Sequence, residues 1–133
     1  MRNDPQPESG AELEHALDGV ISKDMPYSQF RKAVIDRGWS PVQDASCKRN
    51  VVGEGYEQLC RDNPQLALCK ACDEIPELSS CSGDGHCVMQ FSHAGFPRVL
   101  RVASYGEISD WNAPADDSGL GVVSWEYVER EPR

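Results

Sequence analysis

Apolar residues recur every three or four positions between residues 27 and 37, which predicts an amphipathic α-helix. Its apolar arc consists of Tyr27, Phe30, Val34 and Ile35. Asp24 or Ser28 can cap the start of this helix, because short polar side chains accept hydrogen bonds from its first free amides. Gly38 stands where a left-handed residue commonly ends a helix, and Trp39 follows as the apolar residue that packs back on the last turn.

Arg31 lies within the apolar arc of this helix. The stem of an arginine can pack against apolar neighbours while its guanidinium reaches a carboxylate at the edge of the core, and we expect such a pair here. Residues 39–42 then leave the helix as an extended segment. Because Pro41 cannot donate a hydrogen bond to a neighbouring strand, we expect this segment at the edge of a sheet.

The helical period is lost in the middle of the chain, between residues 44 and 85. Residues 56–61 can form one or two helical turns that end before Pro64, and a second short helix can begin near Leu66. We expect the rest of this middle part to be loop.

Alternation of apolar and polar residues, the pattern of a β-strand, dominates the last third of the chain. Residues 87–92 and 97–104 are predicted strands, residues 93–96 a credible hairpin connection, and residues 122–128 the last strand. One face of this last strand consists of Val123, Trp125 and Tyr127. A helix followed by antiparallel strands predicts an α+β fold, with the N-terminal helix packed on a three- to four-stranded antiparallel sheet.

The start of the chain has a different composition from the rest. Residues 1–10 are polar and contain two prolines, which favours a disordered leader. A short helix from residue 11 is also compatible with the pattern, through an apolar stripe of Leu13, Leu17 and Val20. Because 133 residues are typical of one domain, we expect a flexible leader at 1–24 and a single α+β domain at 25–133.

The net charge of −9 comes from acidic residues at the two ends of the chain. Residues 1–18 carry five acidic residues and one arginine, and residues 106–133 carry seven acidic residues and two arginines. This distribution argues against nucleic-acid binding, which requires clustered lysine and arginine. It permits attraction to a basic protein. The chain also lacks a run of about 20 apolar residues that could span a membrane.

All six cysteines lie in the middle of the chain: Cys47, Cys60, Cys69, Cys72, Cys81 and Cys87. So many cysteines in a short acidic chain indicate structural disulfides and an oxidising compartment. We expect a Cys81–Cys87 bridge, and we expect the other four to pair among themselves, with their partners left open. The first residues lack the apolar core of a signal peptide, so we expect a cytosolic chain or, as the cysteines favour, a mature exported chain without its signal peptide.

Cys69 and Cys72 have the CxxC spacing that thiol-redox and zinc sites use. A thioredoxin-like site requires a βαβ unit, which the pattern does not show, and a zinc site requires a second close pair. Both stay as alternatives to structural disulfides. His86 and Cys87 are neighbours on a predicted strand and point to opposite faces, so they are poor catalytic partners. We expect no catalytic residues, no metal site and no cofactor.

A long polar loop, residues 106–121, contains one aromatic residue, Trp111. Tryptophan is enriched among the anchors of protein interfaces, which makes this loop a candidate recognition site. The alternative is that Trp111 folds back onto the edge of the sheet. The candidate partner-binding residues are Trp111, Asp110, Asn112, Asp116 and Asp117.

Two stretches together resemble a group of known proteins: PYSQFR at 26–31 with GWSPV at 38–42, and ELSSCSGDG at 77–85 with CVMQF at 87–91. Over residues 26–105 the chain resembles small exported cysteine-containing proteins of Gram-negative bacteria. The resemblance implies export to the periplasm and no catalytic residue. Proteins of this size and setting include immunity proteins and inhibitors of cell-wall hydrolases.

These observations predict a non-enzymatic periplasmic or secreted protein-binding domain. Its expected partner is a basic secreted enzyme such as a cell-wall hydrolase, for which it would be an inhibitor or an immunity protein. One alternative is a thiol-redox or zinc-binding protein that uses Cys69 and Cys72. The other is a structural envelope protein that acts as an oligomer.

Overall fold

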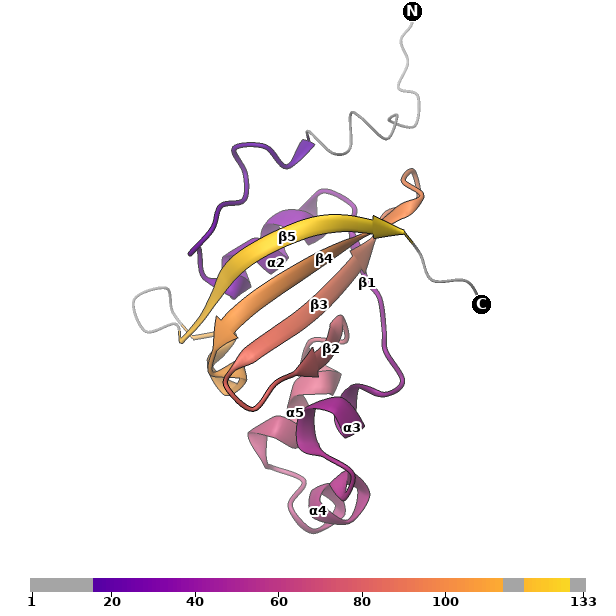
Figure 1. The fold of residues 1–133 in the computed structure, drawn as a ribbon, viewed down its shortest axis with the longest axis vertical. Coiled ribbons are helices and arrows are strands. Elements are labelled where there is room, and N and C mark those ends of the chain that lie inside the picture. The colour runs from indigo at the N-terminus through magenta and orange to yellow at the C-terminus, as the bar shows by residue number, and fades with distance from the viewer. Residues whose placement is uncertain (1–15, 114–118, 130–133) are drawn as a thin grey trace, which may run out of the picture.

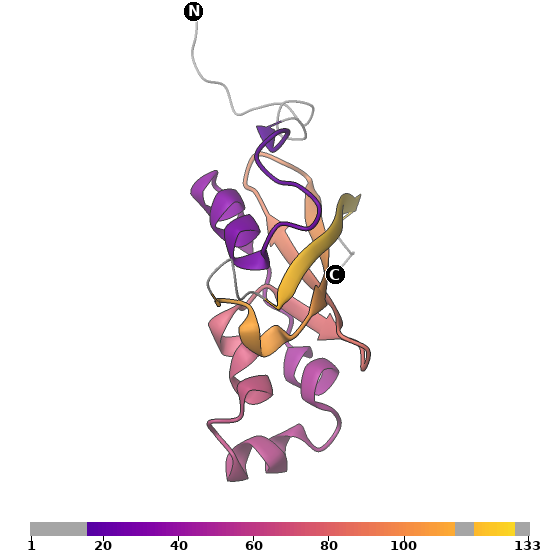
Figure 2. The same ribbon diagram turned by 90° about the vertical axis from the view of Figure 1, so that its left-hand side faces the viewer.

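A computed structural model describes residues 16–113 and 119–129, which form an antiparallel sheet with a helix across one face and shorter helices beyond one end (Figures 1 and 2). The elements are α2 (Tyr27–Asp36), β1 (Ser40–Pro41), α3 (Cys47–Val52), α4 (Tyr56–Asp62), α5 (Ala67–Glu74), β2 (Leu78–Cys81), β3 (His86–Ser92), β4 (Arg98–Gly106), the 3-10 helix η1 (Ile108–Asp110) and β5 (Leu120–Glu129). None of the helices in the described ranges has the length and apolarity that a membrane crossing requires.

The sheet has the order β1-β3-β4-β5, with β2 also paired to β3, and all its pairs are antiparallel. β4 pairs along the length of β3, so β1 and β2 share the opposite edge of β3. Strand β1 pairs at Phe91 and Ser92, and β2 pairs from Met89 to Cys87. The α+β class is therefore confirmed. The short strands β1 and β2 raise the sheet to five strands within the described residues.

The core lies between α2 and the inner face of the sheet (Figure 2). Alternating side chains of the long strands face the helix: Met89, Phe91, Leu100, Val102, Trp125 and Tyr127. Helix α2 contributes Tyr27, Phe30 and Val34, all fully buried as its apolar arc predicts. The ring centroids of Phe30 and Trp125 are 6.1 Å apart. Burial of each large apolar side chain stabilises the fold by about 1.5–3 kcal/mol.

The two ends of α2 differ in how well the sequence predicted them. Gly38 adopts a φ of 94°, and the Trp39 amide donates to the Val34 carbonyl at 3.1 Å, which is the predicted left-handed helix end. The predicted side-chain cap is wrong, because Pro26 is the N-cap and no side chain caps the helix. The Asp24 amide instead donates to the Val122 carbonyl at 2.7 Å, which ties the segment before the helix to β5.

The middle of the chain is more helical than its pattern predicted. Helices α4 and α5 agree with the predicted helices at 56–61 and near Leu66. Helix α3, at Cys47–Val52, lies where we expected loop. Its six residues are too few to show a helical period in the sequence. It packs against β2 and α5, and the disulfide Cys47–Cys72 joins it to α5.

A β-bulge changes which residues of β5 face the core. Ala103 pairs with Ser124 and Ser104 pairs with Val122, so the intervening Val123 has no partner in the register. Val123 is 42% exposed, whereas Val122 is buried. The predicted shared face of Val123, Trp125 and Tyr127 is therefore wrong at Val123, because one extra residue reverses the alternation.

The core extends toward the N-terminus beyond the predicted domain start. Leu17 and Ile21 are buried in the core cluster although they precede residue 25. The Val20 amide donates to the Leu17 carbonyl at 3.0 Å, so this segment contains a turn. Residues 1–15 of the predicted leader, with Leu13 of its apolar stripe, lie outside the described residues.

Candidate functional site

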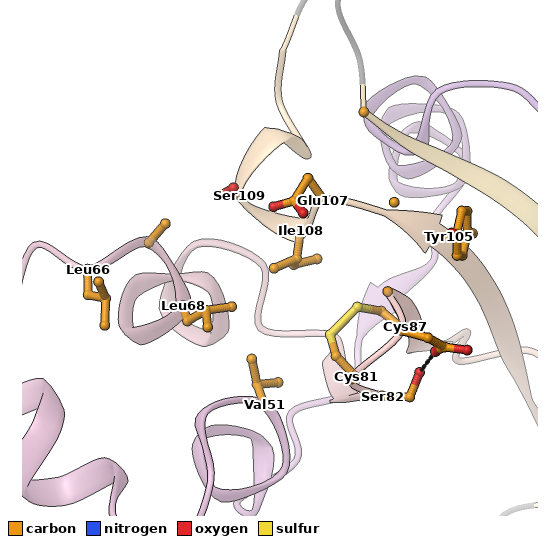
Figure 3. A pocket seen from close by; sticks show the side chains of 16 residues that line it. Val51, Leu66, Leu68, Cys81, Ser82, Cys87, Tyr105, Glu107, Ile108 and Ser109 are labelled. Carbon is orange, nitrogen blue, oxygen red and sulfur yellow. Dashed lines mark hydrogen bonds between the residues drawn. A yellow bond between two sulfur atoms is a disulfide. The ribbon is translucent and has the colours of Figure 1, made fainter.

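An open groove of about 640 Å³ lies between helices α3 and α5 on one side and the β2–β3 hairpin on the other (Figure 3). The end of β4 and the helix η1 form its remaining wall. This volume is within the range of about 300–1,000 Å³ that is usual for binding sites. The groove is the clearest candidate for a functional site.

The floor of the groove is apolar. Val51 from α3, Leu68 from α5 and Ile108 from η1 point toward a shared space, with the Cys81–Cys87 disulfide at its far end (Figure 3). Leu68 is 38% exposed and the nearby Leu66 is 40% exposed. Side chains this large and apolar usually lose more of their surface on folding, so their exposure together marks a surface suited to a ligand or partner.

The exposure of Leu68 follows from where α5 meets the core. The apolar stripe of this helix, at spacings of three and four residues, consists of Leu68, Ala71, Cys72 and Ile75. Its last three members are buried, and Leu68 alone of the stripe is exposed. The stripe therefore extends beyond the core, and its first residue faces the groove.

Acidic side chains lie on the rim of the groove. Asp84 is at the turn of the β2–β3 hairpin and Glu107 precedes η1, and the lining contains no lysine or arginine. The Asp84 carboxylate accepts hydrogen bonds from the Ser82 hydroxyl and from the His86 ring at 3.1 Å. The Ser82 bond first, and the His86 bond second, lower the pKa of Asp84 to about 2. Asp84 therefore stays negatively charged at every physiological pH.

Glycine at position 106 allows the backbone there to approach the backbone of Gly119 closely at one end of the groove. Gly106 has a φ of 132°, and a Cβ there would lie 1.6 Å from the Gly119 carbonyl oxygen. The Glu107 amide donates to the same carbonyl at 2.9 Å. In contrast, a Cβ at Gly83 on the rim would have no atom within 4 Å. The fold therefore requires a glycine at position 106, whereas position 83 faces open space.

All six cysteines form disulfides: Cys47–Cys72, Cys60–Cys69 and Cys81–Cys87. The expected Cys81–Cys87 bridge is present, and the other four pair among themselves as expected. Cys69 and Cys72 belong to different bridges, so they do not form the internal disulfide through which a CxxC redox motif works. With no free thiol, they also offer no thiolate to a metal ion. Three disulfides fit an oxidising compartment.

Trp111 directly follows η1, does not line the groove and is half-buried. Its indole N–H donates to the Glu74 carboxylate at 3.1 Å, and the Arg31 guanidinium lies 5.4 Å from its ring centroid. Trp111 therefore folds back onto the protein, but it contacts α5 and α2 and not the sheet edge that the alternative named. Asp110 and Asn112 are exposed beside it. Asp116 and Asp117 lie outside the described residues. The three predicted partner-binding residues within the described ranges, Trp111, Asp110 and Asn112, do not line the groove.

Arg31 reaches a carboxylate, as its position in the apolar arc predicted, but this carboxylate is deep in the core. Glu77 is fully buried and accepts from the Arg31 Nε at 2.6 Å and from the Tyr27 hydroxyl at 2.7 Å. Burial, and then the negative charge of Glu77, raise the pKa of Tyr27 well above its usual value. This network joins α2 to the segment between α5 and β2.

The sequence pattern did not reveal the groove residues. The available signal was the pair Leu66 and Leu68 beside Pro64, two large apolar residues at the start of a short helix. The pattern could not show that they stay exposed, because this depends on which elements pack over α5. Comparison with known proteins adds no assignment: no family model, no curated protein and no solved structure matches the chain.

Proposed function

We propose that this protein is a non-enzymatic binding domain of the periplasm or the extracellular space, with a basic secreted protein as its partner. The observation that carries the proposal is the groove, which combines exposed Leu66 and Leu68 with the carboxylates of Asp84 and Glu107. Apolar contact area would supply affinity. The acidic rim would orient the partner and exclude acidic proteins.

The rest of the molecule supports this proposal. Three disulfides suit a chain that works in an oxidising compartment. The net charge of −9 would accelerate association with a basic protein at low salt. An inhibitor or immunity protein for a secreted cell-wall hydrolase has these requirements: a small, durable fold and an acidic surface that occupies a basic enzyme.

A paired capture experiment tests the proposal. Immobilised protein is incubated with periplasmic and secreted fractions at low and moderate salt, beside the variants Leu68→Asp and Leu59→Asp. Leu59 is an equally exposed leucine on α4 that does not line the groove. We expect one basic protein that binds the native chain and Leu59→Asp but not Leu68→Asp. The proposal is wrong if no protein is retained, or if both variants retain the same proteins as the native chain.

The outer face of the sheet supports the oligomeric envelope protein as a second candidate function. Among the described residues, no helix covers this face, on which Val88, Ala103 and Val128 are only partly buried. Sedimentation equilibrium would decide, since a monomer mass near 14.7 kDa at high micromolar concentration contradicts this candidate.

A further inference from the structure

We infer that the groove binds a cationic segment of the partner, in which an apolar side chain lies next to a lysine or arginine. The inference rests on the proposed function and specifies the chemistry of its contact. It follows from the way apolar and acidic residues are distributed along the groove.

The two ends of the groove offer different chemistry. Leu66 and Leu68 lie at one end, while Ser82 and the Cys81–Cys87 bridge lie at the other (Figure 3). Asp84 is two residues from Ser82 and hydrogen-bonded to it. An apolar side chain would therefore lie between Leu68, Val51 and Ile108, and a cation of the same segment would reach toward the hairpin.

The acidic rim makes a cation the favoured companion of the apolar anchor. Asp84 and Glu107 come from different elements and both line the groove, and all sixteen lining residues lie within the described parts of the chain. None of the sixteen is a lysine or an arginine that could neutralise these carboxylates or bind an acidic ligand. An anionic ligand would meet like charges, and a neutral ligand would use only the floor.

The available space suits a short stretch of polypeptide. The groove is open along one side, and its volume of about 640 Å³ exceeds that of one side chain several times. Its apolar floor and charged rim match the common interface pattern of an apolar centre with a polar border. A partner segment can therefore enter from the surface without any movement of the fold.

Three synthetic hexapeptides with the same neutral fluorophore test the inference directly. The first combines two leucines with two lysines, the second has glutamates in place of the lysines, and the third has serines in place of the leucines. We expect fluorescence anisotropy to show saturable binding of the first peptide, with at least about tenfold weaker binding of the other two, because each lacks one of the two required contacts.

Variants of the protein locate the binding. Glu107→Gln is expected to weaken the lysine-leucine peptide about threefold, since a single exposed ion pair contributes little. Glu57→Gln removes the same charge from an exposed position on α4, outside the groove. We expect it to weaken peptide binding less than half as much as Glu107→Gln does. Leu68→Asp is expected to abolish binding, and Leu59→Asp to leave it unchanged. Circular dichroism establishes that each variant is folded.

The outcomes separate this inference from the proposed function. Equal binding of the glutamate peptide, or equal effects of Glu107→Gln and Glu57→Gln, overturns the cationic segment. If the lysine-leucine peptide fails to bind while Leu68→Asp still loses a captured protein, the inference is wrong and the proposed function stands. Binding of a neutral naphthylamine dye without peptide binding also overturns it, in favour of a small apolar ligand. Failure of both capture and peptide binding removes both proposals.

Discussion

At the scale of single residues, the fold depends on a few polar groups whose positions are closely determined. Glu77 is the clearest case, because a buried carboxylate is stable only when its oxygens are hydrogen-bonded or paired with a cation. The Tyr27 hydroxyl and the Arg31 guanidinium meet both requirements. The network joins α2 to the segment before β2, so it fixes the helix relative to the disulfide-linked middle of the chain.

Replacement of Glu77 should therefore destabilise the folded protein. Glu77→Ala is expected to lower the free energy of unfolding by about 2–4 kcal/mol, because it leaves a buried tyrosine hydroxyl and a partly buried guanidinium without their acceptor. Tyr27→Phe removes only one hydrogen bond and should cost about 1 kcal/mol. Urea denaturation of the oxidised protein measures both. A loss below about 0.5 kcal/mol for Glu77→Ala would show that the network does not stabilise the fold.

The hairpin turn beside the groove should be sensitive to acid. The pKa of Asp84 is about 2 in the folded protein, below its ordinary value of 3.8. The turn interactions are therefore complete above about pH 4 and are lost as the pH falls toward 2. Titration of the Asp84 carboxyl by NMR should give a midpoint near 2. Ser82→Ala should raise this midpoint toward 3.8, because the hydrogen bond from Ser82 is the largest cause of the lowered pKa. An unchanged midpoint in Ser82→Ala would contradict this assignment.

At the scale of elements, the disulfides compensate for a middle part that has little apolar surface. Helices α3, α4 and α5 are six, seven and eight residues long, which is too short for a stable helix in isolation. Cys47–Cys72 joins α3 to α5, Cys60–Cys69 joins α4 to α5, and Cys81–Cys87 joins β2 to β3. The cross-links therefore hold in place the elements that form the floor of the groove.

The three bridges should differ in their contribution to stability. Their partners are 25, 9 and 6 residues apart for Cys47–Cys72, Cys60–Cys69 and Cys81–Cys87. Removal of each pair as a double alanine variant should cost about 3.5, 2.5 and 2 kcal/mol in that order, because a longer loop restricts the unfolded chain more. Guanidinium denaturation measures the order. If loss of Cys81–Cys87 costs most, contacts in the folded state outweigh the entropy of the unfolded chain.

At the scale of the whole molecule, the apolar floor of the groove lies where three parts of the chain meet. Its residues come from the short helices, the β2–β3 hairpin and the turn after β4, which are distant in sequence. The lining of this apolar surface includes two carboxylates, Asp84 and Glu107, and no lysine or arginine. The fold therefore combines a disulfide-linked scaffold with an apolar groove that has an acidic rim, as a binding domain requires.

The oxidised state of the whole chain can be checked by mass. Protein exported through the periplasm is denatured and alkylated before or after reduction, and its intact mass is measured. We expect no cysteine to react before reduction and six to react after it, because no free thiol is present. Cytosolic expression in a reducing strain is the control and should give six reactive thiols. Two or four reactive cysteines in the exported protein would contradict the three bridges and reopen the redox and zinc alternatives.

The sequence by itself determined the α+β class, helix α2 with its glycine end, the pairing of β3 with β4 and the Cys81–Cys87 bridge. These features are local: they depend on hydrophobic period, turn residues and cysteine spacing, which neighbouring residues define. The tertiary structure alone decided the β5 bulge at Val123, the helical state of Cys47–Val52, the other two disulfides, the buried partner of Arg31 and the exposure of Leu68. Each of these depends on which distant segments pack together, and the free energy of burial and pairing that selects them does not appear in the local pattern.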